Sequence, residues 1–300
     1  MERRRIGSLE VSVVGLGCNN FGWRIDKNAT RAVVETALDG GINFLDTADM
    51  YDTGKSEEYL AEALRGRRNE VVLATKFGFS MGEGKSGASP AYVRQALDAS
   101  LLRLRTDRID LYQLHTPDKA TPIADTLAAL DGLVKAGKIR EIGCSNFSAE
   151  QLREAGNRFA SVQNEYSLFH RAPEADVLPE CKRLGISFIP YFPLANGLLT
   201  GKYRKGHPPP ENSRGKDGFG PTVFTDRNLD IVESLIRFAA QHGHSLLELA
   251  VSWLAAQDTV ASVIAGARTP EQAKMNAGAA SWKLTKSELA EVDEIVMQAA

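Results

Sequence analysis

The chain has 300 residues, 43% of them hydrophobic, which is enough for a large buried core in one α/β domain or in two smaller ones. Its 36 basic and 38 acidic residues leave a formal charge of -2, so small molecules are expected as partners rather than nucleic acid or an anionic membrane. Three scattered cysteines without CxxC spacing favour a reducing cytosol over a disulfide framework or a metal site.

Near the amino end, RRRIGSLEVSVV predicts a small β-hairpin that turns at Gly7 and Ser8 and covers one end of the fold. The same segment is too charged for a signal peptide or a membrane anchor, so we expect a cytoplasmic protein. Short apolar runs follow, each succeeded by a segment of helical period. They span residues 13–17, 42–46, 71–76, 109–115, 139–145, 161–166, 186–191 and 259–266.

Start and stop signals mark several of the intervening helices. A hydroxyl precedes a proline at Ser89-Pro90 and at Thr121-Pro122, and Gly137 falls where the second of these helices should end. Capping boxes are predicted at Ser148 and Gln151, Ser245 and Glu248, Thr269 and Gln272, and Thr285 and Glu288.

Near-continuous apolar strands that alternate with helices predict a parallel sheet covered by helices, and eight such units predict a (β/α)8 TIM barrel that forms one domain over residues 1–300. The alternative is a doubly wound nucleotide-binding sheet, but the third glycine of its fingerprint comes too late in GLGCNNFG. The long irregular stretch 194–224 is interpreted as a lid, with a tolerated surface insertion as the alternative.

Four polar residues lie at or just beyond the ends of predicted strands: Asp46, Tyr51, Lys76 and His115. Each alone has an ordinary structural explanation, but a barrel would bring all four to one mouth. There the Lys76 ammonium would lower the pKa of Tyr51, and Asp46 would hold Lys76. His115 would orient a substrate oxygen or share the proton. Ser56, followed by two glutamates, is predicted to cap the next helix.

The stretches GINFLDTADMYDTGKSEEYLAEAL, VVLATKFG, DLYQLH, GKIREIGCSNF, VQNEYSLF and GLLTGKY resemble the aldo-keto reductases, in particular bacterial NADP-dependent members. The resemblance implies a TIM barrel whose catalytic tetrad is Asp46, Tyr51, Lys76 and His115, with Asp46 also near the cofactor. It implies hydride transfer from a nicotinamide to a carbonyl carbon while Tyr51 donates a proton. It also implies a small carbonyl substrate and favours a monomer.

A nicotinamide needs hydrogen-bonding side chains for its carboxamide and a ring against one face. Ser145 and Asn146 end the fifth strand, Gln163 lies on the sixth, and Tyr191 ends the seventh as a candidate stacking ring. These positions also match those of the resembled family. Ordinary turn chemistry remains the alternative for Ser145 and Asn146.

A phosphate site is expected after the eighth strand, where Gly266 is followed by a helix start. Arg268 is predicted to bind a 2′-phosphate, and Gln272 and Asn276 to reach the adenosine, which favours NADPH and leaves NADH open. We also expect cofactor contacts by Pro193, just before the lid, and by Leu194, Gly197, Leu199 and Lys202 within it.

Aromatic residues after the first and third strands are candidates for the wall of a substrate pocket: Phe21, Trp23, Phe77 and Phe79. Packing under loops is the alternative for them. Two other functions stay open. One is a sugar or alcohol dehydrogenase that works oxidatively with NAD(P), and the other is a cofactor-loaded, non-catalytic binding module like the channel β subunits that the resemblance includes.

Overall fold

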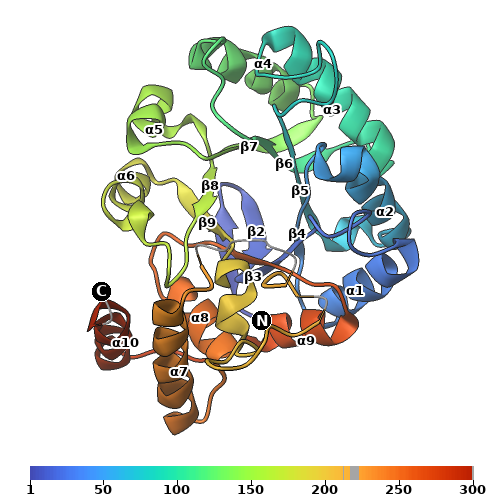
Figure 1. Cartoon of the computed structure of the whole chain (residues 1–300). Helices are drawn as coiled ribbons and strands as arrows, with labels where there is room; N and C mark the ends of the chain where they lie inside the picture. Colours follow the sequence, from blue (N-terminus) through green and yellow to red (C-terminus); the bar gives the residue numbers. More distant parts are fainter. Residues whose placement is uncertain (212, 217–222, 299–300) are drawn as a thin grey trace.

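The structure is a computed structural model that describes residues 1–211, 213–216 and 223–298. Its centre is a parallel sheet in the order β10-β3-β4-β5-β6-β7-β8-β9 (Figure 1). The strands are β3 (Val14–Gly17), β4 (Phe44–Asp46), β5 (Val72–Phe77), β6 (Ile109–Leu114), β7 (Ile139–Ser145), β8 (Ser161–Glu165), β9 (Ser187–Tyr191) and β10 (Val263–Gly266). Each lies inside or at the edge of one of the predicted apolar runs.

The sheet closes on itself between β9 and the segment just before β10. The N–H of Phe188 in β9 donates to the carbonyl of Thr259, and the N–H of Ala261 donates back to the carbonyl of Phe188. The predicted barrel is therefore confirmed, and the doubly wound alternative is wrong because that architecture leaves its sheet open.

Helices follow the strands and surround the barrel (Figure 1). They are α1 (Lys27–Asp39), α2 (Lys55–Ala63), α3 (Pro90–Leu104), α4 (Ile123–Lys135), α5 (Ala149–Ala155), α6 (Val177–Leu184), α7 (Asp226–Gln241), α8 (Leu246–Ala255), α9 (Pro270–Gly278) and α10 (Lys286–Gln298). Short 3-10 turns are η1 (Tyr51–Gly54), η2 (Arg68–Glu70), η3 (Gly156–Arg158), η4 (Ala172–Glu174) and η5 (Ala195–Thr200). None of the described helices is both long and apolar enough to cross a membrane.

Most of the predicted helix signals are confirmed. Ser89 caps α3, the boxes at Ser148 and Ser245 are complete, and Thr285 exchanges hydrogen bonds with Glu288. Gly137 follows the end of α4 with a φ of +72°, which a glycine adopts without strain.

Three cap predictions need correction. Thr121 does not cap α4, because its hydroxyl donates to Asp118 and the helix begins after Pro122. Ser56 lies inside the first turn of α2, whose N-cap is Gly54. Thr269 caps α9, but the side chain of Gln272 accepts from the N–H of Arg268, so the box is incomplete.

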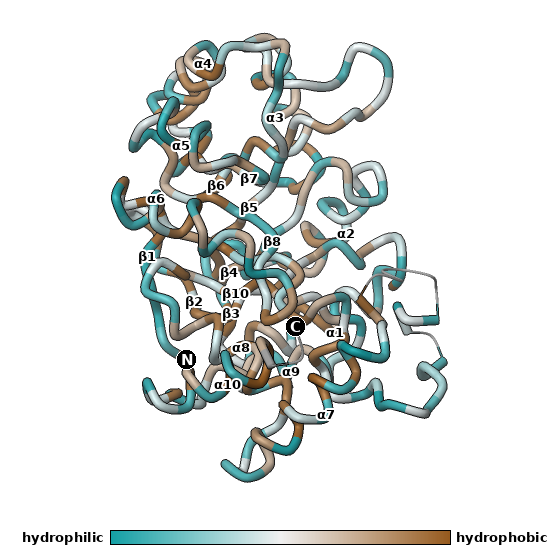
Figure 2. The backbone as a smooth tube through the Cα atoms, turned by 60° about the vertical axis from the view of Figure 1, so that its left-hand side comes forward, coloured by the Kyte–Doolittle hydropathy of each residue, from teal (hydrophilic) through white to brown (hydrophobic). Residues whose placement is uncertain are grey.

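The predicted hairpin forms the floor of the barrel. Strands β1 (Arg3–Ile6) and β2 (Leu9–Ser12) pair antiparallel across Gly7 and Ser8. Ile6 and Leu9 are fully buried against barrel-lining residues such as Phe44 and Leu111. Figure 2 shows hydrophobic stretches along the central strands and many hydrophilic ones on the outer helices and loops. With its amino-terminal end filled, the barrel can open only at the carboxyl ends of its strands.

Candidate active site

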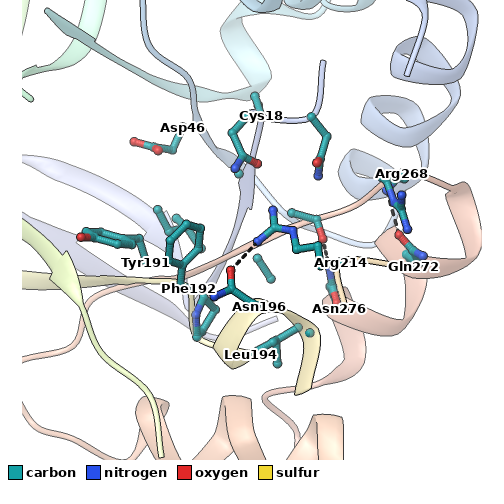
Figure 3. Close-up of a pocket in the computed structure, with 18 of the residues that line it drawn as sticks. Cys18, Asp46, Tyr191, Phe192, Leu194, Asn196, Arg214, Arg268, Gln272 and Asn276 are labelled. Atoms are coloured by element: carbon teal, nitrogen blue, oxygen red, sulfur yellow. Dashed lines mark hydrogen bonds between the residues drawn. The ribbon is translucent and has the colours of Figure 1, made fainter. Parts of the chain in front are cut away.

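A cavity of about 570 Å³ opens at the carboxyl ends of the strands (Figure 3). The predicted site residues that line it are Asp46, Tyr51, His115, Ser145, Asn146, Gln163, Tyr191, Pro193, Leu194, Gly197, Lys202, Gly266, Arg268, Gln272 and Asn276. Residues 212 and 217–222 of the predicted lid lie outside the described residues, but the described η5 segment borders this cavity.

A buried ion pair stands at the barrel end of the cavity. Asp46 ends β4, and Lys76 reaches it from β5 so that its Nζ lies 2.5 Å from Asp46 Oδ2. Both side chains are almost completely buried. Burial by itself would lower the pKa of Lys76, but the Asp46 carboxylate and the Tyr51 oxygen raise the pKa overall. Lys76 is therefore a charged ammonium, and Nζ also donates to the carbonyl of Thr47 at 2.9 Å.

The second oxygen of Asp46 is held by two glutamines. Gln113 Nε2 and Gln163 Nε2 each donate to Asp46 Oδ1 at 3.0 Å. The sequence reasoning missed Gln113, although strand alternation puts it on the same face of β6 as Leu111, a residue of the barrel interior. A carboxylate whose oxygens accept from one ammonium and two amides is fixed in place.

Tyr51 follows β4 and presents its hydroxyl 3.4 Å from Lys76 Nζ. Burial raises the pKa of this phenol, and the nearby Lys76 charge offsets the increase only in part. The expected net lowering of the Tyr51 pKa is therefore wrong, because loss of water disfavours the phenolate more than one ammonium favours it. The phenol stays protonated at neutral pH and has a proton to give.

His115 follows β6 and packs beside Tyr51. The two ring centroids are 5.9 Å apart in an edge-on arrangement. The ring centroid of Phe79 lies 4.6 Å from that of the same imidazole. Burial, and secondly the charge of Lys76, lower the pKa of His115 to about 2. The imidazole is therefore neutral at neutral pH, and its buried Nδ1 has no hydrogen-bond partner among the described residues.

The polar residues predicted on β7, β8 and β9 form one connected group. Tyr191 donates its hydroxyl to Asn146 Oδ1 at 2.9 Å, and Asn146 Nδ2 donates to the carbonyl of His115 at 2.9 Å. Ser145 Oγ donates to the carbonyl of Gln163 at 2.7 Å. Asn146 has a φ of +63°, an unusual conformation that these contacts hold. These hydrogen bonds fix the positions of the side chains relative to one another.

The opposite end of the cavity is cationic. Figure 3 shows Arg268 and Gln272 far from Asp46, with Arg214 between them. Arg214 Nη1 donates to Asn196 Oδ1 at 3.1 Å, and burial, followed by the charges of Arg24 and Arg268, lowers the pKa of Arg214. This concentration of guanidinium groups beside the start of α9 favours an anionic ligand.

Gly266 lies close to the loop after β3 at the same end. A Cβ on Gly266 would lie 2.9 Å from Asn20 Nδ2, so a side chain there would press on the Asn20 side chain. The glycine leaves room along the cavity wall, and Asn276 Nδ2 donates to the Gly266 carbonyl at 3.3 Å.

Three predicted contacts are wrong because the side chains lie in the core. Phe21, Phe77 and Leu199 are fully buried and do not line the cavity. The Phe77 ring stacks on the Tyr112 ring on the outer side of the sheet, with the two ring centroids 4.6 Å apart. Trp23 and Phe79 are also not among the residues that line the cavity, but they are 50% and 36% exposed on loops after the strands, so their place in a substrate pocket stays a prediction.

Several lining residues were not identified from the sequence: Cys18, Asn19, Asn20, Arg24, Phe192, Asn196, Thr200, Arg214, Leu247, Ile264, Ala265 and Met275. Most come from loops, where no periodicity shows which side chain points inward. For Arg214 and Asn196 the only signal was their place in the long lid stretch.

A closed parallel barrel carries a buried Asp-Lys pair, a tyrosine and a histidine beside a cavity, an arrangement that suits a barrel oxidoreductase. Comparisons with known proteins agree with this class. A profile described as the Aldo/keto reductase family matches residues 13–297. Over 298 residues the chain is 36% identical to the "Uncharacterized oxidoreductase YqkF" of Bacillus subtilis (strain 168), covering 96% of this chain and 94% of that protein.

Two solved structures are similar over nearly their whole length. The glycerol dehydrogenase AKR11B4 from Gluconobacter oxydans matches with a TM-score of 0.86 and 32% identity, covering 99% of this chain and 95% of that one. The aldo-keto reductase AKR11C1 from Bacillus halodurans, in its holo form, matches with a TM-score of 0.81 and 34% identity, covering 100% and 96%. The chain belongs to the aldo/keto reductase family and is an NAD(P)H-dependent oxidoreductase. This finding favours an enzyme over a non-catalytic binding module.

Proposed function

We propose that the protein uses NADPH to reduce the carbonyl group of a small aldehyde or ketone to an alcohol, with Tyr51 as the general acid. One observation carries the proposal. The protonated Tyr51 hydroxyl lies 3.4 Å from a Lys76 ammonium that is itself held by the buried Asp46. A phenol placed in this way can release its proton to a developing alkoxide while a fixed positive charge stabilises the phenolate it leaves.

Each of the four residues has its own part in the proton transfer. Tyr51 donates its hydroxyl proton to the carbonyl oxygen, Lys76 stabilises the resulting charge, and Asp46 keeps Lys76 in place. His115, being neutral, can offer a hydrogen bond to the same oxygen without adding charge. When bound, the nicotinamide supplies the hydride that no side chain can supply.

The residues at the two ends of the cavity support the binding of a phosphorylated dinucleotide. Ser145, Asn146, Gln163 and Tyr191 are proposed to hold the nicotinamide, and Asp46 closes that end. At the other end Arg268, Gln272 and Asn276 are proposed to bind the adenosine side, and the buried Arg214 supplies a further cation there. Along the wall we propose contacts by Pro193, Leu194, Gly197, Lys202 and Gly266.

A preference for NADPH over NADH follows from the same charges. The additional 2′-phosphate of NADPH would lie near the guanidinium groups of Arg214 and Arg268, beside the N-terminus of α9. NADH lacks that phosphate, so it would gain less from them. We therefore expect NADH to be used, but less effectively.

Substrate is proposed to enter past Trp23 and Phe79, the exposed aromatic residues on the loops after β3 and β5. Phe79 already contacts His115, so the outer part of a substrate would meet its ring. The chain is proposed to act as a cytoplasmic monomer of one domain, and light scattering of the purified protein measures that oligomeric state.

A second candidate is the reverse reaction, oxidation of an alcohol with NAD(P)+. It is favoured by the similarity to a protein described as a glycerol dehydrogenase. Tyr51 would then have to accept a proton, for which its raised pKa is unfavourable near neutral pH. We accordingly favour reduction at neutral pH and expect oxidation to gain at alkaline pH.

The test is a panel of aldehydes and ketones assayed by loss of NADPH absorbance, beside glycerol and other alcohols assayed with NADP+ and NAD+. Reduction at neutral pH should be faster than oxidation. Turnover of alcohols alone would favour the second candidate, and no turnover in either direction would contradict both.

A further inference from the structure

The turn that carries Tyr51 has an unusual backbone. After Tyr51, three consecutive residues have left-handed φ values: Asp52 at +46°, Thr53 at +55° and Gly54 at +91°. The glycine adopts this conformation freely, but a β-branched threonine there is strained. Such a conformation persists only where neighbouring contacts hold it. Some part of the structure must therefore hold the turn in place.

The first turn of α2, which directly follows this turn, is anchored through Glu57. Glu57 is completely buried, its Oε1 accepts from Thr75 Oγ1 at 2.6 Å, and its Oε2 accepts from Arg103 Nε at 2.6 Å. Thr75 precedes Lys76 on β5, and Arg103 comes from α3. The start of α2 is thus tied directly to the strand that supplies Lys76.

Arg103 also touches the turn itself. A Cβ built on Gly54 would lie 2.5 Å from Arg103 Cδ, so the arginine stem covers the last residue of the turn. On the other side, Ser56 Oγ donates to the carbonyl of Cys18 at 2.9 Å. The turn is therefore held between α3 and the loop after β3.

A second buried carboxyl faces the same arginine. Asp49, in the loop between β4 and η1, is almost fully buried and lies close enough to Glu57 and Arg103 to feel the charge of both. Its oxygens have no hydrogen-bond partner among the described residues. Arg103 is hydrogen-bonded to Glu57, and its charge, together with that of Lys76, opposes the rise in the pKa of Asp49.

We propose that Arg103, acting through Glu57 and Gly54, is a positioning residue that holds the Tyr51 hydroxyl beside Lys76. Arg103 is not among the residues that line the cavity, so its effect on the reaction is indirect, and we assign that effect to the place of Tyr51. The kinetic part of this inference rests on the proposed reductase function, whereas the position of the turn can be measured without it.

The test compares Arg103→Met with Arg94→Met, since Arg94 is an exposed arginine on the same helix. We expect Arg103→Met to lower kcat by about 100-fold, as a displacement of about 1 Å in a reacting group can do. The Kd for NADPH, measured by fluorescence, should not change, because the cofactor contacts lie on other elements. Hydrogen exchange should increase in the segment 47–58 and not in 263–278. Glu57→Gln, which keeps the shape of the side chain, should show the same pattern more weakly.

Two results would overturn the proposal. One is that Arg103→Met has a lower melting temperature than Arg94→Met but the same kcat and the same hydrogen exchange in residues 47–58. That result would indicate that Arg103 has a purely structural role. The other is a kcat loss without any local increase in exchange. If the wild type turns over no carbonyl compound, the proposed function fails, and the exchange comparison still decides whether Arg103 holds the turn.

Discussion

The Asp46–Lys76 ion pair provides the sharpest prediction about stability and activity together. Lys76→Met replaces a buried ammonium by an apolar side chain of similar length and leaves Asp46 buried. Removing one partner of a buried pair typically costs about 3–5 kcal/mol of folding stability. Because the Gln113 and Gln163 amides still donate to Asp46, we expect a loss of about 3 kcal/mol, at the lower end of that range.

The same change should also slow the reaction. Without the ammonium, the Tyr51 phenolate loses its stabilising charge, and a contribution of about 100-fold or more to kcat is lost. Urea denaturation and steady-state kinetics measure the two effects. Lys85→Met, at an exposed lysine, is the control, and the double variant Asp46→Asn with Lys76→Met should recover part of the stability but none of the activity. A Lys76→Met protein as stable and as active as the control would refute this account of the pair.

Three further predictions concern charge at other positions. Arg268→Ala should raise the KM for NADPH far more than that for NADH, and equal increases would contradict the 2′-phosphate assignment. Burial, with Glu57 nearby, raises the pKa of Asp49 to about 7. The protonated Asp49 therefore contributes its full share to the free energy of unfolding below pH ~4, and this contribution is lost as pH rises to ~7. Asp49→Asn should therefore be more stable than wild type at pH 8, by up to about 4 kcal/mol, and the gain should vanish near pH 4 in denaturation curves. The lowered pKa of His115 gives the opposite pH dependence. As pH falls from 7 to 5, the free energy of unfolding of the wild type should decrease by about 2 kcal/mol more than that of His115→Gln. Parallel plots of this free energy against pH for the two proteins would contradict the prediction.

The sequence predicted the barrel well because its strands are buried on both faces and therefore appear as short apolar runs. The hairpin floor and most helix caps depend on local residue types, and these were also correct. Convergence of Asp46, Lys76 and His115 follows from the parallel register, in which Gly17 pairs with Asp46 and Lys76 pairs with Gln113. The catalytic and cofactor roles of these residues stay predictions.

The errors came from properties that depend on tertiary packing. The net pKa of Tyr51 is set by how much water is excluded, which the sequence does not reveal. Phe77 was misplaced although the neighbouring Lys76 points inward, so alternation along β5 should have turned Phe77 outward. Arg214 was missed because its loop has no periodicity. Leu199 was taken as a cofactor contact because its segment borders the site, yet its side chain packs into the core.

The central claim is that Tyr51 gives the proton in a hydride-transfer reaction at this site. The most direct test is Tyr51→Phe, assayed with NADPH and the best carbonyl substrate of the panel, together with the Kd for NADPH. We predict that kcat falls by at least about 100-fold while the Kd for NADPH is unchanged. A Tyr51→Phe enzyme that turns over at the wild-type rate would contradict the claim.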